Sequence, residues 1–323
     1  MLVFVLNAGS SSLKYQLIDI KSKELKASGL VERIGIDGIL KHEIGENKKI
    51  TFELPIPTHK EAIELVLRIL TNDETKVINS IDEIKAIGHR VVHGGEYFKG
   101  SVIVDDEVIR KIEELIPLAP LHNPANILGV KICKDLMPKV PNVVTFDTAF
   151  HQTMPMENFL YAVPYADYTE HHLRKYGFHG TSHYYVSQEA IKLLNKKDSK
   201  VIVCHLGNGS SVCAVKDGKS ISTSMGLTPL EGLVMGTRSG DIDAGVIPYL
   251  MEKKGLNHIQ ILDYLNKKSG ILGVSGVSSD LREVIKAAND GDKRSKIAIT
   301  MLCDRIKKYL CSYAGLMHGV DAI

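Results

Sequence analysis

The chain lacks an excess of either charge. Its 323 residues include 40 lysines and arginines against 38 aspartates and glutamates, which leaves a formal net charge of +2. Binding to nucleic acid or to an anionic membrane requires a strongly basic surface, so we expect neither partner. With 44% hydrophobic and 24% charged residues, the composition is typical of a soluble globular protein of about two domains. Any chemistry on phosphate must therefore come from individually placed residues.

Long hydrophobic runs are also missing. The first apolar stretch, Leu2–Leu6, is short, has no basic residues ahead of it and leads into Asn7 and a serine cluster. A secretory signal needs a longer apolar region, and a membrane span needs about 20 apolar residues. The sequence therefore predicts a cytoplasmic protein without a membrane segment.

Cysteine spacings typical of disulfide frameworks are absent. The cysteines are odd in number, widely scattered and never arranged as C-x-x-C. Most of them lie in apolar runs, and we expect reduced side chains in the core. They are Cys133, Cys204, Cys213, Cys303 and Cys311.

Familiar metal, nucleotide and nucleophile motifs are incomplete or absent. The pairs His89/His93 and His179/His183 have zinc-ligand spacing but lack the glutamate of H-E-x-x-H, so a metallohydrolase is the weaker interpretation. Gly218-Lys219-Ser220 ends like a P-loop, yet Cys213 stands at the leading glycine position. No dinucleotide fingerprint is completed after Gly207-Asn208-Gly209, and no G-x-S-x-G elbow occurs.

Short β-branched runs alternate with helical patterns throughout the chain, which predicts an α/β protein. Capping signals predict helices after Thr58 (with Glu61), after Asp105, at Asn123-Pro124, and at Thr181 or Ser182. The last two place His122 and His179 just ahead of helix N-termini, where backbone dipoles favour anions. The expected strands are Leu2–Leu6, Leu13–Ile20, Ala86–Val92, Asn142–Phe146, Val201–His205 and Val212–Val215.

The end of the chain carries a long helical pattern, from about Lys293 to Met317, followed by Gly319 as a helix stop. Val320–Ile323 then has the composition of half a buried strand. We interpret this ending as a truncation.

Two similar segments suggest an internal duplication. Residues 3–14 and 201–212 each consist of an apolar strand, a polar glycine and serine turn, and a returning strand. Their wide separation favours two related lobes facing one cleft over a repeat array. A single turn of this kind commonly only closes a hairpin, but two matching copies favour phosphate binding by backbone N–H groups and hydroxyls. Lys14 would add a positive charge.

Three charged residues stand out. Arg90 lies in an otherwise apolar strand and needs a partner, which is either a structural acid or a ligand carboxylate or phosphate. Arg238 lies in a glycine-punctuated loop, which favours anion binding. Asp147 closes a strand of the predicted sheet and could cap a turn, orient a nucleophile or hold a metal-bound water. Asp241-Ile242-Asp243 competes for the metal role.

Seven ordered motifs spread over nearly the whole chain closely resemble the acetate and butyrate kinase family. They are residues 7–14, 88–95, 118–124, 146–151, 176–183, 205–211 and 228–241. The resemblance implies two duplicated, actin-like (ribonuclease H-like) α/β lobes around a nucleotide cleft, at 1–147 and 148–323, the second incomplete. It also implies a homodimer and direct, reversible phosphoryl transfer from ATP to acetate, giving ADP and acetyl phosphate, with Mg²⁺ or Mn²⁺.

The resemblance also assigns roles to individual residues. Asp147, His179, Arg238 and Arg90 would be catalytic, and Asn7 would contact the metal. Acetate would meet Arg90, Val92, Leu121, His122 and Pro229. The nucleotide would meet Ser10, Ser12, Lys14, His205, Leu206, Gly207, Asn208, Gly209, Asp280, Leu281 and Arg282.

The ending departs from the family pattern. Family members continue past Val320 with a glycine-rich nucleotide loop and a metal-binding glutamate, so we expect weakened catalysis from these 323 residues. A propionate or butyrate kinase remains an alternative, because one methylene is worth only about 1–3 kcal/mol of discrimination. A non-catalytic, actin-like ATP-binding protein is the other alternative.

Overall fold

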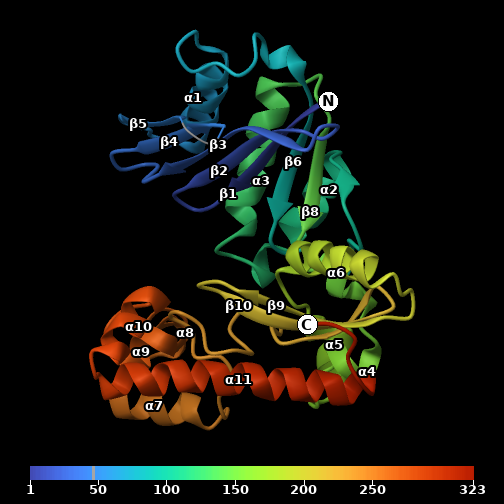
Figure 1. Cartoon of the computed structure of the whole chain (residues 1–323), viewed down its shortest axis with the longest axis vertical. Helices are drawn as coiled ribbons and strands as arrows, with labels where there is room; N and C mark the ends of the chain where they lie inside the picture. Colours follow the sequence, from blue (N-terminus) through green and yellow to red (C-terminus); the bar gives the residue numbers. More distant parts are fainter. Residues whose placement is uncertain (46–47) are drawn as a thin grey trace. The chain divides into compact units, whose positions relative to one another are not determined.

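The computed structural model describes residues 1–45 and 48–323, which divide into two compact units, Met1–Ala149 and Phe150–Ile323. Figure 1 labels their elements. Within the described residues, no helix is both long enough and apolar enough to cross a bilayer.

Unit 1 is built on one mixed sheet of strand order β5-β4-β3-β2-β1-β6-β8-β7. Strands β1, β6 and β8 are parallel neighbours, while β1 to β5 form an antiparallel meander. The carboxyl ends of β1, β6 and β8 therefore lie at one edge of the sheet (Figure 1). The strands are β1 Leu2–Ala8, β2 Leu13–Asp19, β3 Glu24–Glu32, β4 Ile39–Ile44, β5 Lys48–Glu53, β6 Ile84–Val91, β7 Val102–Ile103 and β8 Asn142–Phe146.

Three helices cover this sheet: α1 (His59–Thr71), α2 (Asp106–Glu114) and α3 (Asn123–Leu136). The apolar stripe of α1 joins Phe4, Leu6 and Leu17 in one core cluster, and Phe98 stacks on Phe146 in a second. Among the described residues of both units, 3₁₀ turns lie at Ile81–Glu83, Ile116–Leu118 and Ala149–Thr153, the last spanning the boundary between the units.

The predicted helix caps of unit 1 are largely confirmed. Thr58 and Asp105 accept hydrogen bonds from the backbone N–H groups of Lys60 and Val108, and His122 is the N-cap of α3. The Thr58 hydroxyl also donates to the Glu61 carboxylate.

Asn126 of α3 ties the ends of two strands together. Its amide nitrogen donates to the Ala8 carbonyl at the end of β1 (2.7 Å), and its amide oxygen accepts from the Val92 N–H just after β6 (3.0 Å). The side chain is buried, so neither backbone group has water as a substitute partner. One amide thereby sets the spacing of the sheet edge.

Unit 2 has a smaller antiparallel sheet of order β11-β10-β9, with α6 on one face and α11 on the other (Figure 1). Alternate residues of β10 explain this sandwich: Val212 and Ala214 join the α11 side, whereas Cys213 and Val215 join the α6 side. The strands are β9 Lys200–Leu206, β10 Ser210–Lys216 and β11 Lys219–Thr223. The helices are α4 Met156–Phe159, α5 Tyr165–His171, α6 Gly180–Leu194, α7 Val246–Lys254, α8 His258–Lys267, α9 Gly270–Ser275, α10 Leu281–Asn289 and α11 Lys293–Met317.

The predicted helix start at Thr181 or Ser182 is wrong. His179 is the N-cap of α6, in the left-handed region at φ 58°, and it holds no side-chain capping bond. The Ser182 hydroxyl is instead bonded to His205 Nδ1 at 2.9 Å, so a contact distant in sequence takes the group that would cap the helix.

Two cysteine predictions are also wrong. All five thiols are free, but Cys303 and Cys311 are exposed, because only one stripe of α11 packs against the sheet.

The predicted half-strand at the chain end does pair with β9, through the Ile202 N–H and the Ala322 carbonyl at 3.0 Å. Gly319 supports the helix stop through its N–H, although His318 is the left-handed residue.

Replacing Asn126 tests the link between β1 and β6. We expect Asn126→Ala to lower the free energy of unfolding by about 2–4 kcal/mol, because it leaves one buried carbonyl and one buried N–H unpaired. Urea denaturation followed by circular dichroism measures this loss. Asn79→Ala removes an exposed amide from the same unit and should change stability by less than about 0.5 kcal/mol; equal losses would contradict the assignment.

Candidate active site

Three polar side chains meet at the carboxyl edge of the unit 1 sheet. Asn7 lies in β1, Arg90 in the adjacent β6, and Asp147 directly after β8. Arg90 Nε donates to Asp147 Oδ1 at 3.0 Å and Arg90 Nη2 donates to Oδ2 at 2.6 Å. A longer contact of 3.4 Å joins Arg90 Nη1 to the Asn7 amide oxygen. The sequence left the partner of Arg90 open, and the structure identifies Asp147 as an ion-pair partner.

The Arg90–Asp147 pair is unevenly buried. The Asp147 side chain is 4% exposed, whereas that of Arg90 is 43% exposed. Burial acts to lower the pKa of Arg90, but the hydrogen bonds and charge of Asp147 outweigh it and hold that pKa above its ordinary value. Arg90 is therefore a fixed cation with one buried counter-ion and an open outer side. That outer side can receive a second carboxylate or a phosphate.

The remaining predicted residues of unit 1 surround this cluster unequally. Val92 is buried after β6, whereas Leu121 is 73% exposed and His122 is exposed at the start of α3. Lys14 pairs in register with Asn7 across β1 and β2, and both line a pocket of about 380 Å³ over strands β1 to β4.

The turn between β1 and β2 is closed by its own backbone. The Gly9 N–H donates to the Ser12 carbonyl at 2.8 Å, and the Gly9 carbonyl contacts His59 Nε2 at 2.7 Å. Gly207 behaves in the same way in unit 2, where its N–H donates to the Gly209 carbonyl at 3.2 Å. The expectation that these turns present an open array of donors is wrong for the Gly9 and Gly207 N–H groups. Ser10 and Ser12 lie in the first turn.

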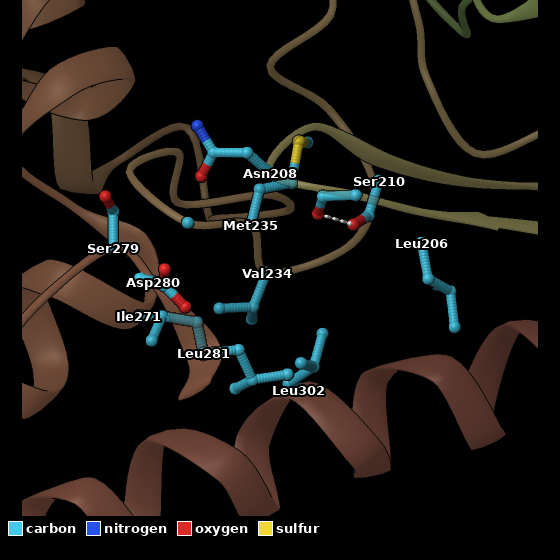
Figure 2. A pocket seen from close by; sticks show the side chains of 12 residues that line it. Leu206, Asn208, Ser210, Val234, Met235, Ile271, Ser279, Asp280, Leu281 and Leu302 are labelled. Carbon is cyan, nitrogen blue, oxygen red and sulfur yellow. Dashed lines mark hydrogen bonds between the residues drawn. The ribbon is translucent and has the colours of Figure 1, made fainter. Parts of the chain in front are cut away.

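Unit 2 contains a pocket of about 410 Å³ beside the turn between β9 and β10 (Figure 2). Leu206, Gly207 and Asn208 line it from the turn, and Asp280 and Leu281 line it from the start of α10. Five of the residues predicted to bind nucleotide are thus brought together. The residues of the pocket that the sequence analysis did not single out are Ser210, Val234, Met235, Gly236, Ile271, Ser279 and Leu302.

Ser210 lies within the sixth sequence motif, and Val234, Met235 and Gly236 lie within the seventh, so these motifs contained a signal for them. Ile271 and Leu302 come from α9 and α11 and read simply as core positions. Gly236 lies close to the turn: a Cβ there would lie 1.8 Å from Asn208 Oδ1, so any larger residue would displace the Asn208 side chain. The Gly236 N–H also donates to the Asn208 carbonyl at 3.0 Å, which joins this loop to the turn.

Arg238 and His179 approach the turn at the same point. A Cβ built on Gly209 would lie 3.4 Å from Arg238 Nη1 and 3.6 Å from His179 Nε2. Arg238 Nη1 donates to the Pro229 carbonyl at 3.3 Å, and no carboxylate of the described chain forms an ion pair with this guanidinium. Burial lowers the pKa of Arg238. A half-buried arginine without a paired acid is typical of an anion site.

His179 and His205 lie face to face beside this point. Their rings are stacked with centroids 4.1 Å apart, and His179 Nδ1 lies 2.8 Å from the Ser211 hydroxyl.

Several predicted residues are also bonded to other groups of the chain. The Arg282 side chain is 91% exposed and forms a bidentate ion pair with Asp280, which is the N-cap of α10. The hydrogen bonds from Arg282 lower the pKa of Asp280 to about 2. Asp241 accepts from the Gly232 N–H and the Tyr309 hydroxyl and pairs with Arg305, so its carboxylate already has protein partners. The competing metal role of Asp241-Ile242-Asp243 stays a prediction. In the part of the chain that the structure describes, no three His, Cys, Asp or Glu side chains gather into a metal site.

A family model described as the acetokinase family matches residues 2–323. The chain belongs to the acetokinase family. An acetate kinase of Treponema denticola is 55% identical over 326 residues, which cover 100% of this chain and 82% of that protein. The resemblance drawn from the seven motifs is thus confirmed, and with it the prediction of a kinase.

Solved structures of this family agree with the fold. The structure of Porphyromonas gingivalis acetate kinase has 50% sequence identity and a TM-score of 0.96, covering 99% of this chain and 81% of that one. A propionate kinase from Francisella tularensis subsp. tularensis SCHU S4 has 44% identity and a TM-score of 0.93, covering 99% and 82%. The predicted actin-like α/β fold class is confirmed. The roles of individual residues stay predictions.

Removing Arg90 tests the role of its ion pair. We expect Arg90→Met to lower the free energy of unfolding by about 2–4 kcal/mol, because the buried Asp147 carboxylate loses its counter-ion. The loss is smaller than for a fully buried pair, since part of the Arg90 side chain is in contact with water. The double variant Arg90→Met/Asp147→Leu should recover part of this loss, since no charge is then left buried.

Urea unfolding of the four combinations at these two positions measures the coupling. Lys131→Met is the matched control, because it breaks an exposed pair with Glu113 in the same unit and should cost less than about 1 kcal/mol. A double variant that is as unstable as the two single losses combined would contradict the coupling.

Proposed function

We propose that this protein transfers a phosphoryl group reversibly from ATP to acetate, giving acetyl phosphate and ADP. The observation that carries the proposal is the acetokinase match over residues 2–323, supported by acetate kinases at about 55% identity. The predicted site residues supply what such a reaction needs, namely a carboxylate site, a nucleotide pocket and unpaired positive charge.

Arg90 is proposed to bind the acetate carboxylate. Its inner edge is occupied by Asp147, and its outer side is exposed. Acetate is already ionised near neutral pH, so the reaction needs no strong base at this position. Asp147 then acts mainly by fixing the guanidinium plane. Val92, Leu121 and Pro229 stay predicted contacts of the methyl group, and His122 a predicted contact of the substrate.

The pocket of unit 2 is proposed to bind the nucleotide. Val234, Ile271 and Leu302 give it apolar walls that suit a planar base, and its volume of about 410 Å³ is in the range of small-molecule sites. Asn208 and Ser210 bring polar groups from the β9–β10 turn (Figure 2). The Ser210 hydroxyl donates to the Gly207 carbonyl at 2.8 Å, which rigidifies the turn.

Arg238 and His179 are proposed to stabilise the transferring phosphoryl group. The transition state of phosphoryl transfer spreads charge over three equatorial oxygens, and donors held in place beforehand lower its energy. Both side chains approach Gly209 from different elements, and neither needs to move a proton for this role. Direct in-line transfer requires no covalent enzyme intermediate.

A divalent cation is part of the proposal. Asn7 and Asp147 each present a hard oxygen atom to the Arg90 guanidinium, and Mg²⁺ commonly takes one or two protein oxygens together with water and substrate phosphates. Both oxygens also accept from Arg90, so the protein alone would hold the ion weakly. When bound, Mg²⁺ or Mn²⁺ would neutralise phosphate charge.

Propionate is the second candidate acceptor. The propionate kinase of Francisella tularensis is 44% identical to this chain, and a pocket discriminates one methylene by only about 1–3 kcal/mol. The homodimer and the cytoplasmic location stay predictions.

Trapping of acyl phosphate with hydroxylamine tests the proposed function. With MgATP we expect acetate-dependent hydroxamate, a smaller rate with propionate and less again with butyrate. Product that does not depend on the added acid, or no product from a sample shown to be folded, would contradict kinase activity of this chain. ATP binding without turnover would support the non-catalytic alternative.

Two substitutions should separate charge stabilisation from nucleotide binding. Arg238→Ala should lower kcat by at least about 100-fold while the affinity for ADP changes little, because the guanidinium acts on transition-state charge. Gly236→Ala should mainly raise KM for ATP, since its Cβ would displace Asn208. Steady-state kinetics and ADP titration measure both, and equal losses of kcat and affinity in Arg238→Ala would contradict its role.

A further inference from the structure

A chain of hydrogen bonds through buried side chains ends at the Nδ1 atom of His179. The Ser211 hydroxyl oxygen lies 2.8 Å from His179 Nδ1 and 2.7 Å from His183 Nε2. Ser211 belongs to β10, while His179 caps α6 and His183 lies one turn into that helix. Ser211 and His183 are both fully buried, so water does not compete for these contacts.

The Ser211 hydroxyl carries one proton and can donate it to only one of the two rings. If it accepted from both rings, its own proton would need a third acceptor, and among the described residues its hydroxyl has no hydrogen-bond partner besides the two histidines. If Ser211 donates to His179 Nδ1, its oxygen must accept a hydrogen bond from His183 Nε2–H, and the neutral His179 then carries its own proton on Nε2. If Ser211 donates to His183 Nε2 instead, His179 must be protonated on Nδ1, and the neutral His183 carries its proton on Nδ1.

The far nitrogen of His183 distinguishes these arrangements. His183 Nδ1 is buried and has no hydrogen-bond partner among the described residues. A buried N–H without an acceptor is rarer and more costly than a nitrogen lone pair without a donor. The first arrangement leaves only a lone pair there, whereas the second leaves an N–H.

The surroundings oppose an extra proton on this chain. Burial, followed by the neighbouring charges of His151, His179 and His205, holds the pKa of His183 well below its ordinary value. A cationic His179 would also face the stacked His205 ring and the Arg238 guanidinium at Gly209. Both features disfavour an additional proton on the two rings.

We infer that Ser211 and His183 are positioning residues that hold His179 as the neutral tautomer with its proton on Nε2. In this state the Nε2–H is a fixed donor on the side of the ring that lies 3.6 Å from a Cβ built on Gly209, next to Arg238. The use of that donor in catalysis rests on the proposed function, whereas the tautomer does not.

Long-range ¹H–¹⁵N spectra of ¹⁵N-histidine-labelled protein test the tautomer directly, with His179→Gln and His183→Gln used for assignment. We expect both rings to be neutral at pH 7, each with a protonated Nε2 and an unprotonated Nδ1. His179 protonated on Nδ1, or on both nitrogens, would overturn the inference. This result does not depend on turnover, so it is separate from a failure of the kinase assay.

Ser211→Ala extends the test to catalysis. We expect loss of the single His179 tautomer and a fall in kcat of about 10- to 100-fold, with KM for ATP and acetate within about 2-fold. Ser211→Thr keeps the hydroxyl and should restore the tautomer and most of kcat. Ser187→Ala is the matched control, because it also removes a buried hydroxyl, in α6, whose only hydrogen-bond partner among the described residues is the Tyr184 carbonyl. An unchanged tautomer in Ser211→Ala would overturn the positioning role.

Discussion

The parallel alignment of β1, β6 and β8 is the constraint on which the unit 1 site depends. Parallel neighbours end at the same edge of a sheet, so Asn7, Arg90 and Asp147 come together although they lie far apart in the chain. Asn126 fixes the distance between the first two strands, and the ion pair connects the second to the third. The sheet edge and the polar cluster therefore stabilise one another.

Unit 2 repeats the hairpin but uses it differently. In its turn the Asn208 side chain lies against Gly236, and the hydrogen bond from the Gly236 N–H to the Asn208 carbonyl joins the turn to the loop lining the pocket. Behind the turn, Ser211 and two histidines form a buried polar chain in which the proton positions are limited by geometry. Buried polar groups destabilise the fold unless they form hydrogen bonds. In the proposed tautomer, the hydrogen bonds of this chain fix the orientation of the His179 ring and of its Nε2–H.

Local patterns predicted much of the secondary structure. The strand at 142–146 and the helix at 293–317 have the expected bounds, because alternation of β-branched residues and helical spacing are short-range signals. The start of α6 was misplaced because Ser182 is taken by His205, and the burial of Cys303 and Cys311 was misjudged because periodicity alone did not show which stripe of α11 packs. These errors all involve contacts between distant segments.

The sequence alone determined the family, the actin-like fold class and most of the residues proposed for the site, because ordered motifs and strand ends are written locally in the chain. Only the tertiary structure decided which acid meets Arg90, which apolar residues wall the unit 2 pocket, and which nitrogen of His179 is held by Ser211. Those outcomes depend on distances of a few ångströms between residues dozens of positions apart. These distances arise only when the chain folds, because neither the amino-acid composition nor the spacing of residues along the sequence specifies which distant side chains meet.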